Sequence, residues 1–159
     1  MAHALALNAN HPLLVWKSQA RSFSFGLFGG RRKSSKIGDR PLTVLAVDDD
    51  ALVLMNTTLM LEDLGHQVLE AYSGQEALSA LKQADNRIDL VITDHSMPRM
   101  TGAELAATIA TEWPGLPVVL ATGYAELPDG SGNHLPRLPK PFSQAQLSDI
   151  IASVTGSTV

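Results

Sequence analysis

Four aspartates stand where two short apolar runs end, and they are the residues best placed to do chemistry. The triplet Asp48-Asp49-Asp50 directly follows one run, and Asp94 directly follows another. Buried strand ends seldom carry unpaired acids, and carboxylates that share a pocket repel one another. A divalent cation removes that repulsion, and oxygen ligands without thiolates or a histidine pair favour Mg²⁺ over Zn²⁺. The sequence therefore predicts a magnesium site built from Asp48, Asp49 and Asp94.

A hydroxyl and an ammonium group stand at the ends of two further apolar runs. Thr122 follows the run 117–121, and Lys140 follows the short run 137–139. If both groups lie at the same edge of a sheet as Asp94, they would stabilise a phosphoryl group bound to that acid. Either residue alone would be ordinary, and Asp50 needs no ligand role because acids commonly open helices. The coincidence of four strand ends is what favours a site.

Short apolar runs alternate with amphipathic stretches from Leu42 onward, which predicts an α/β fold. The first, third and fourth runs have the continuous apolar character of strands buried on both faces. The runs predicted as strands are Thr43–Val47, His66–Ala71, Asp89–Thr93, Pro117–Ala121 and Arg137–Pro139. The predicted helices are Ala51–Leu64, a helix opened by a capping box of Ser73 and Glu76 and running to about Gln83, Gly102–Trp113, and a helix opened by a capping box of Ser143 and Gln146 and running through Val154.

The strand–helix alternation predicts a doubly wound, five-stranded parallel sheet with helices on both faces. In such sheets ligands bind beyond the carboxyl ends of the strands, where the strand order reverses. With the order 2-1-3-4-5 this point lies between the first and third strands, where Asp48, Asp49 and Asp94 would converge. The segment Tyr124–Pro136 breaks the alternation, because its prolines and glycines leave room for at most a short or irregular fourth helix.

Composition places the chain among globular proteins of ordinary size. It has 159 residues, of which 45% are hydrophobic and 18% charged, enough for one domain and a tail. The absence of cysteine excludes disulfides and thiolate metal sites. No apolar run is long enough for a transmembrane helix, and the N-terminus lacks the pattern of a secretory signal. We therefore expect a cytoplasmic protein without stable membrane insertion.

Charge divides the chain into two parts. Residues 1–38 hold six Lys and Arg and no acid, whereas residues 40–159 hold six Lys and Arg against fifteen acids, a net charge of 6 − 15 = −9. This predicts a basic, flexible N-terminal extension over residues 1–40 and a globular domain over residues 41–159. A docking segment for a partner or a membrane surface is the alternative for the extension. An acidic domain argues against binding to nucleic acid.

The strand-end motifs together resemble the receiver domain of two-component response regulators, over residues 42–155. They read VLAVDDD at 44–50, LVITDHSMPRMTG at 90–102, VLATGY at 119–124 and LPKPF at 138–142. The resemblance implies a flavodoxin-like fold, a phosphoacceptor at Asp94, and Mg²⁺ held by Asp48, Asp49, Asp94 and the backbone carbonyl of Ser96. It also implies that Thr122 is the switch hydroxyl and that Lys140 pairs with the phosphoryl group.

The resemblance implies a signalling protein and not an enzyme in the usual sense, although receivers catalyse their own phosphorylation and dephosphorylation. The phosphodonor would be a histidine kinase or a histidine phosphotransfer protein, and the receiver would be a monomer or weak dimer. The ATGY motif is similar to the so-called FATGUY subgroup of single-domain receivers, although Leu120 replaces its Phe. Arg137 departs from the family, which often has an aromatic residue three positions before the lysine that reports the movement of the threonine. Tyr124, two residues after Thr122, is the alternative candidate for this reporter role.

Two other functions are compatible with the sequence. The chain could be a pseudo-receiver, a binding module that never takes up phosphate. It could also be an aspartyl-phosphate phosphatase or phosphotransferase, although the second acid expected two residues after the nucleophile is Ser96. We expect no attached effector domain, so a receiver of this kind would dock to an unknown downstream partner or act as a phosphate sink. Whether it is free-standing or derived from a hybrid kinase is open.

Overall fold

The computed structural model describes residues 40–83, 87–123 and 134–156, so residues 1–39 of the predicted extension lie outside it. All predicted strands and the four predicted helices are present close to their predicted bounds. In chain order they are β1 Thr43–Val47, α1 Ala51–Asp63, β2 Gln67–Ala71, α2 Gly74–Lys82, β3 Leu90–Asp94, α3 Gly102–Glu112, β4 Val118–Thr122, β5 Arg137–Pro139 and α4 Gln144–Thr155. The short helix considered between the fourth and fifth strands falls largely outside the described residues.

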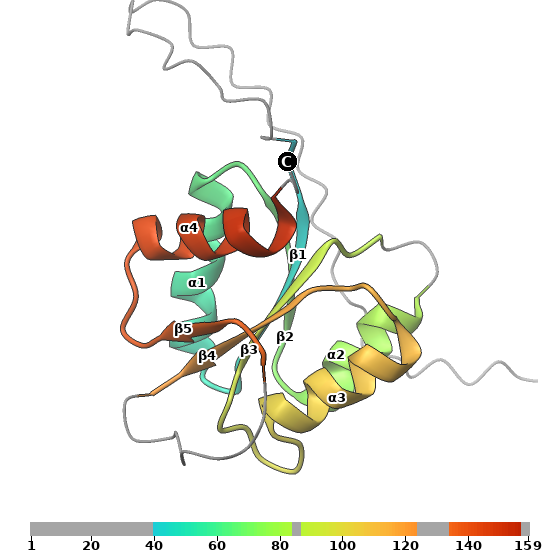
Figure 1. The fold of residues 1–159 in the computed structure, drawn as a ribbon. Helices are drawn as coiled ribbons and strands as arrows, with labels where there is room; N and C mark the ends of the chain where they lie inside the picture. Colours follow the sequence, from blue (N-terminus) through green and yellow to red (C-terminus); the bar gives the residue numbers. More distant parts are fainter. Residues whose placement is uncertain (1–39, 84–86, 124–133, 157–159) are drawn as a thin grey trace, which may run out of the picture. The chain divides into compact units, whose positions relative to one another are not determined.

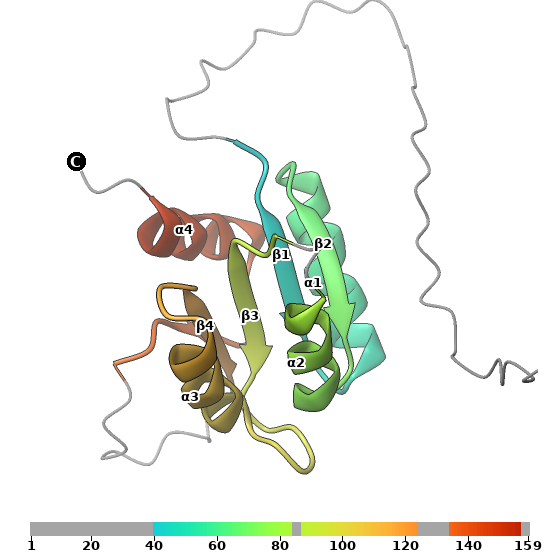
Figure 2. The ribbon, with the colours of Figure 1, turned by 90° about the vertical axis from the view of Figure 1, so that its right-hand side faces the viewer.

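The five strands form one parallel sheet in the order β2-β1-β3-β4-β5, which confirms the predicted doubly wound topology. Helices α1 and α4 cover one face, and helices α2 and α3 cover the other (Figures 1 and 2). Because successive strand side chains point to opposite faces, each central strand supplies both layers of the core. Leu45 and Val91 lie in the cluster under α2 and α3, whereas Val44 and Ile92 lie in the cluster under α1 and α4.

The central strands are buried as their composition predicts. All residues of β3 and β4 are buried, as are four of the five residues of β1. The same arrangement carries the carboxyl ends of β1, β3 and β4 to one edge of the sheet (Figure 2). Among the described residues, no helix combines the length and the apolar character needed to cross a membrane.

Side-chain caps fix where the helices begin. The Asp50 carboxylate accepts hydrogen bonds from the amides of Leu52 and Val53 at 2.9 and 3.2 Å, which explains the third aspartate of the triplet as an N-cap. The predicted capping box of Ser143 and Gln146 is also confirmed at the start of α4.

The predicted capping box of Ser73 and Glu76 is only half right. The Ser73 hydroxyl accepts from the Glu76 amide at 3.2 Å, but the Glu76 carboxylate accepts from the Tyr72 amide, not from that of Ser73. Ser73 is fully extended, which presents the preceding amide to the carboxylate. A complete capping box of Thr101 and Glu104 opens α3 instead, although the sequence reading did not single it out.

Arg99 has a left-handed backbone, with a φ angle of 68° in the loop between β3 and α3. Such a conformation costs a residue with a Cβ atom about 1 to 2 kcal/mol, whereas glycine adopts it freely. We therefore expect Arg99→Gly to raise the free energy of unfolding by about 1 kcal/mol, measured by urea denaturation. Arg99→Lys, which keeps the Cβ atom, is the matched control. A glycine variant less stable than the lysine variant would contradict this interpretation.

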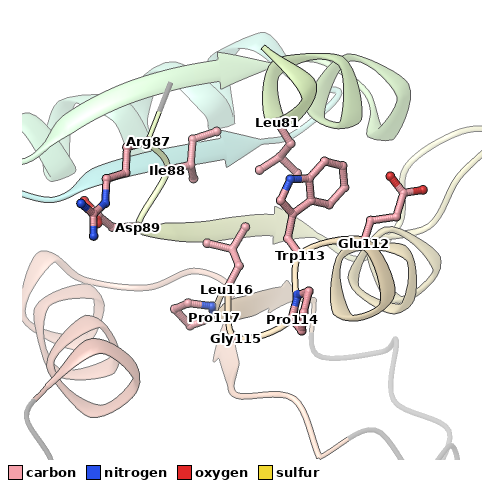
Figure 3. Close-up of a pocket in the computed structure, with 10 residues that line it drawn as sticks. All are labelled: Leu81, Arg87, Ile88, Asp89, Glu112, Trp113, Pro114, Gly115, Leu116 and Pro117. Carbon is pink, nitrogen blue, oxygen red and sulfur yellow. The ribbon is translucent and has the colours of Figure 1, made fainter. Parts of the chain in front are cut away.

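A cavity lies at the end of the sheet away from the aspartates. Its volume is about 560 Å³, and it is bordered by the residues that precede β3 and β4, including Ile88, Asp89, Leu116 and Pro117. Figure 3 shows the Trp113 side chain beside this hollow. No carboxylate of the predicted magnesium site lines it, so the candidate site has to be sought at the opposite edge.

Candidate functional site

Three carboxylates converge at the carboxyl ends of β1 and β3, as the topology predicts. Asp48 directly follows β1, and Asp94 is the last residue of β3 instead of the residue after it. Since β1 and β3 are neighbours in the sheet, one oxygen from each of Asp48, Asp49 and Asp94 lies within 4.8 Å of the others. The sequence therefore identified the acidic cluster correctly, with a one-residue error in the end of the strand.

Two of the three carboxylates are buried and held by backbone amides. Asp48 is 6% exposed and Asp94 is 8% exposed, whereas Asp49 is exposed. The Asp50 amide donates to Asp48 Oδ1 at 2.9 Å, and the Ser96 amide donates to Asp94 Oδ2 at 2.8 Å. Each of these bonds uses one carboxylate oxygen, so the second oxygen of Asp48 and of Asp94 is available to another partner. They also fix the position of Asp94 before any ligand arrives.

Lys140 supplies the positive charge that the buried pair requires. Its Nζ atom lies 2.7 Å from Asp48 Oδ2 and 2.5 Å from Asp94 Oδ1, so one ammonium bridges both carboxylates. Burial alone would lower the pKa of Lys140, but the hydrogen bonds and charges of Asp48 and Asp94 together outweigh it and raise the pKa above 10.5. The ammonium therefore stays protonated at neutral pH.

Lys140 can reach these acids because it stands at the same end of the sheet. It directly follows β5, and its amide donates to the Thr122 carbonyl at 2.8 Å, which ties it to the end of β4. Thr122 is the last residue of β4, is 2% exposed, and is next to β3 in the sheet. All four predicted strand-end groups, Asp48, Asp94, Thr122 and Lys140, thus occupy one edge.

The donor set fits a hard divalent cation. Three carboxylates offer oxygen ligands, no thiolate is available in the chain, and one carboxylate is open to solvent. The contact of a lysine ammonium with two of them shows that the cluster attracts positive charge. Asp48, Asp49 and Asp94 could therefore hold a metal ion. The role predicted for the Ser96 carbonyl stays a prediction, since its described contact is through the amide.

Two residues that the sequence reading did not select lie against Asp94. Gly102 opens α3, and a Cβ atom there would collide with the Asp94 carbonyl and with Leu120 Cδ1. His95 has the one buried side-chain polar atom, among the described residues, that lacks a hydrogen-bond partner, its Nδ1. A glycine in the motif could have signalled a close approach, but nothing in a single sequence shows whether a histidine nitrogen is paired.

Of the two candidates for reporting the phosphorylated state, Arg137 lies within the described residues and Tyr124 does not. Arg137 is the first residue of β5, is half-buried, and is in register with Leu120 of β4. The structure thus places a cation where an aromatic side chain was expected from the family. Tyr124, the other candidate reporter, lies outside the described residues.

Comparison with known proteins supports the resemblance. A family model for the response regulator receiver domain matches residues 44–152. The chain is 36% identical over 115 residues to the sensor kinase CckA of Brucella abortus (strain 2308), covering 69% of this chain and 12% of that kinase. It is 33% identical over 114 residues to the response regulator MprA of Mycobacterium sp. (strain KMS), covering 67% of this chain and 47% of that regulator.

Solved structures agree with the sequence comparison. A response regulator receiver domain from Clostridium thermocellum matches with a TM-score of 0.66 and 30% identity, covering 72% of this chain and 94% of that one. The chemotaxis protein CheY4 of Vibrio cholerae matches with a TM-score of 0.64 and 28% identity, covering 72% and 99%. The receiver domain of a hybrid histidine kinase CckA also matches, with a TM-score of 0.60 and 27% identity, covering 72% and 99%.

The chain spans less than half the length of these two curated relatives. The similarity to the FATGUY subgroup stays a prediction. The matched residues, however, make up more than half of this chain and include the whole acidic edge. The chain therefore belongs to the response regulator receiver domain family, the signalling switches of two-component systems.

Proposed function

We propose that this receiver domain takes a phosphoryl group onto Asp94 from a histidine kinase or a histidine phosphotransfer protein. The observation that carries the proposal is the single ammonium of Lys140 shared by the buried carboxylates of Asp48 and Asp94. A site of this kind is built to hold excess negative charge, and a phosphoryl group adds more. A solvent-open third acid, Asp49, completes a set that can bind a cation from outside.

The residues divide the work of the transfer among them. An Asp94 oxygen attacks the phosphorus of the donor phosphohistidine, an O–P bond forms, and the P–N bond breaks so that the imidazole leaves. The Ser96 amide holds one Asp94 oxygen, which orients the other for attack. Lys140 neutralises the charge on the transferred oxygens. Bound Mg²⁺, held by Asp48, Asp49, Asp94 and the Ser96 carbonyl, would add further neutralisation of that charge.

The phosphorylated state is read through Thr122. Its hydroxyl lies at the end of β4, one strand from Asp94, and would donate a hydrogen bond to the phosphoryl group. Forming this bond draws Thr122 toward Asp94 and changes the surface that follows β4, which a downstream partner recognises. Alternatively, the domain serves as a phosphate sink. Hydrolysis of the acyl phosphate resets the switch. We place this cycle in the cytoplasm.

An exposed apolar stripe on α1 suits a protein donor. Leu52, Met55 and Leu59 are 73%, 53% and 53% exposed, and their spacing places them on one side of the helix. Leu52 lies in the first turn of α1, two residues after Asp50, so a partner seated on the stripe would lie close to the acidic edge. Clustered exposed apolar side chains mark interaction surfaces.

We expect Leu52→Asp to slow transfer from a phosphorylated donor protein by about tenfold, the effect of losing about 1.4 kcal/mol at an interface. Transfer from acetyl phosphate, which needs no docking surface, should proceed at the wild-type rate. Radiolabel transfer with each donor measures the two rates. Ala152→Asp, on an exposed position of α4, is the control for added charge. Equal slowing with both donors would contradict a docking role for Leu52.

The proposed function is tested by incubating the whole chain with acetyl phosphate and Mg²⁺ and measuring its mass. We expect a gain of one phosphoryl group that EDTA prevents and that Asp94→Asn abolishes. No gain, together with no spectral response to beryllofluoride, would establish a pseudo-receiver instead. Sustained turnover of a small phosphate ester would establish a phosphatase or phosphotransferase.

A further inference from the structure

A buried nitrogen without a partner lies next to the acidic edge. His95 Nδ1 is shielded from solvent and makes no hydrogen bond, the one such side-chain atom in the described part of the chain. Leaving a polar atom buried and unpaired costs stability, so each case needs a reason. Two hydrogen bonds hold the backbone of His95 in place, so the chain does not shift to expose this nitrogen to solvent. Its amide donates to the Ala121 carbonyl at 3.0 Å, and its carbonyl accepts from the Gly102 amide at 2.9 Å.

The hydrogen-bond pattern places His95 directly opposite Thr122. The Val91 amide donates to the Pro117 carbonyl, and Val91 is in register with Val118, the residue after the acceptor. The His95 amide donates to Ala121 in the same way, so its partner across the strands is Thr122. Backbones of neighbouring strands lie about 4.8 Å apart, which is within reach of an imidazole and a hydroxyl.

Side-chain alternation puts the two residues on the same face. His95 follows Val91 at an even spacing, and Thr122 follows Val118 at an even spacing, so each shares a face with the earlier residue. Val91 and Val118 both lie in the core cluster under α2 and α3. Continued one residue beyond the end of β3 at Asp94, this alternation predicts that the His95 and Thr122 side chains are neighbours at this end of the sheet.

We propose that His95 is a positioning residue for Thr122. When Asp94 is phosphorylated, the Thr122 hydroxyl donates its proton to a phosphoryl oxygen, and its oxygen keeps free lone pairs. His95 Nδ1–H donates to that oxygen, giving the chain Nδ1–H to Oγ1–H to phosphoryl. The unpaired nitrogen of the resting state is thus satisfied only in the switched state, which favours that state. This inference rests on the proposed phosphorylation of Asp94.

The test uses the whole chain saturated with beryllofluoride and Mg²⁺, with nuclear magnetic resonance of the Thr122 methyl group and the His95 ring nitrogens. In the wild type, the His95 Nδ1 resonance should move to the position of a nitrogen that donates a hydrogen bond. His95→Phe keeps the ring but removes the donor. It should lower the ratio of switched to resting Thr122 signals about two- to tenfold, the factor given by one net hydrogen bond. His95→Asn, whose amide reaches the Nδ1 position, should restore the ratio.

His95→Gln places its amide one bond further out and should behave like the Phe variant. An unmoved wild-type Nδ1 resonance, a Phe variant with the wild-type ratio, or an Asn variant as impaired as Phe would each overturn the proposal. If the Phe variant does not fold, the wild-type Nδ1 measurement decides alone. A wild type that accepts neither beryllofluoride nor a phosphoryl group overturns the proposed function and this inference together. Phosphorylation without the His95 effect overturns the inference alone.

Discussion

Replacing Lys140 by methionine is expected to slow phosphoryl uptake from acetyl phosphate by about a hundredfold, the usual effect of losing one preorganised charge at a reacting group. The same change should lower the free energy of unfolding in metal-free buffer by about 2 kcal/mol. The second effect arises because Asp48 and Asp94 would be left buried with no counter-charge. This loss of stability stays below the 3 to 5 kcal/mol that is typical of breaking a fully buried ion pair, since the Lys140 side chain is 23% exposed.

The charge of Lys140 also gives the stability a defined pH dependence. The folded-state pKa of Lys140 is raised above 10.5, because its hydrogen bonds and charge interactions with Asp48 and Asp94 outweigh the cost of burial. Its contribution is therefore fully present below pH 10.5 and is lost as the pH rises through the folded-state pKa. In the methionine variant this loss of stability in the alkaline range should be missing.

Lys82→Met is the matched control. Lys82 pairs with Glu112 at 3.9 Å, but its side chain is 63% exposed, and such surface pairs contribute less than about 1 kcal/mol. Uptake by this variant should match the wild type. Millimolar Mg²⁺ should recover stability in the Lys140 variant more than in the wild type, because the cation replaces the missing charge. If the two lysine variants unfolded at the same urea concentration, the bridging role of Lys140 would be wrong.

Gly102→Ala is expected to destabilise the fold by about 2 kcal/mol, in the range of overpacked sites. The new methyl group would collide with the Asp94 carbonyl and with Leu120 Cδ1. The leucine can move aside, but the carbonyl belongs to the strand that carries Asp94. Relief therefore requires displacing the backbone of Asp94, and phosphoryl uptake should slow as well. Urea denaturation and acetyl phosphate kinetics measure the two effects.

Gly74→Ala gives a matched comparison, since Gly74 also opens a helix behind a hydroxyl cap. Its nearest clash is with the Met100 sulfur at 2.5 Å, an atom near the flexible end of a side chain. We expect a loss of about 1 kcal/mol, recovered in part by Met100→Ala, with uptake at the wild-type rate. An uptake defect as large as that of the Gly102 variant would show that the effect does not pass through Asp94.

Much of the fold was predictable because two local signals agree. The apolar runs of β1, β3 and β4 are uninterrupted, as expected for strands buried on both faces, and turn and cap residues separate them from the helices. In a parallel sheet in which β1 and β3 are neighbours, acids at the ends of these two strands have to meet. The acidic cluster could therefore be placed from Asp48 and Asp94 without knowing any distance.

Other features depend on tertiary geometry that spacing does not encode. Glu76 satisfies the Tyr72 amide in place of the Ser73 amide because Ser73 is extended, and a backbone angle cannot be read from a four-residue motif. The unpaired Nδ1 of His95 depends on which atoms surround the ring after folding. The sequence predicted that Lys140 lies at this end of the sheet, but it did not predict that the ammonium contacts both Asp48 and Asp94.

The identity of the phosphoacceptor can be tested by locating the phosphoryl group chemically. Borohydride reduces an aspartyl phosphate to homoserine, so treating the acetyl phosphate-labelled chain with it and sequencing its peptides by mass spectrometry marks the modified residue. We predict homoserine at position 94 only, formed in the presence of Mg²⁺ and prevented by EDTA. Labelling at Asp48 or Asp49, or a labelled chain with an intact Asp94, would show that Asp94 is not the phosphoacceptor.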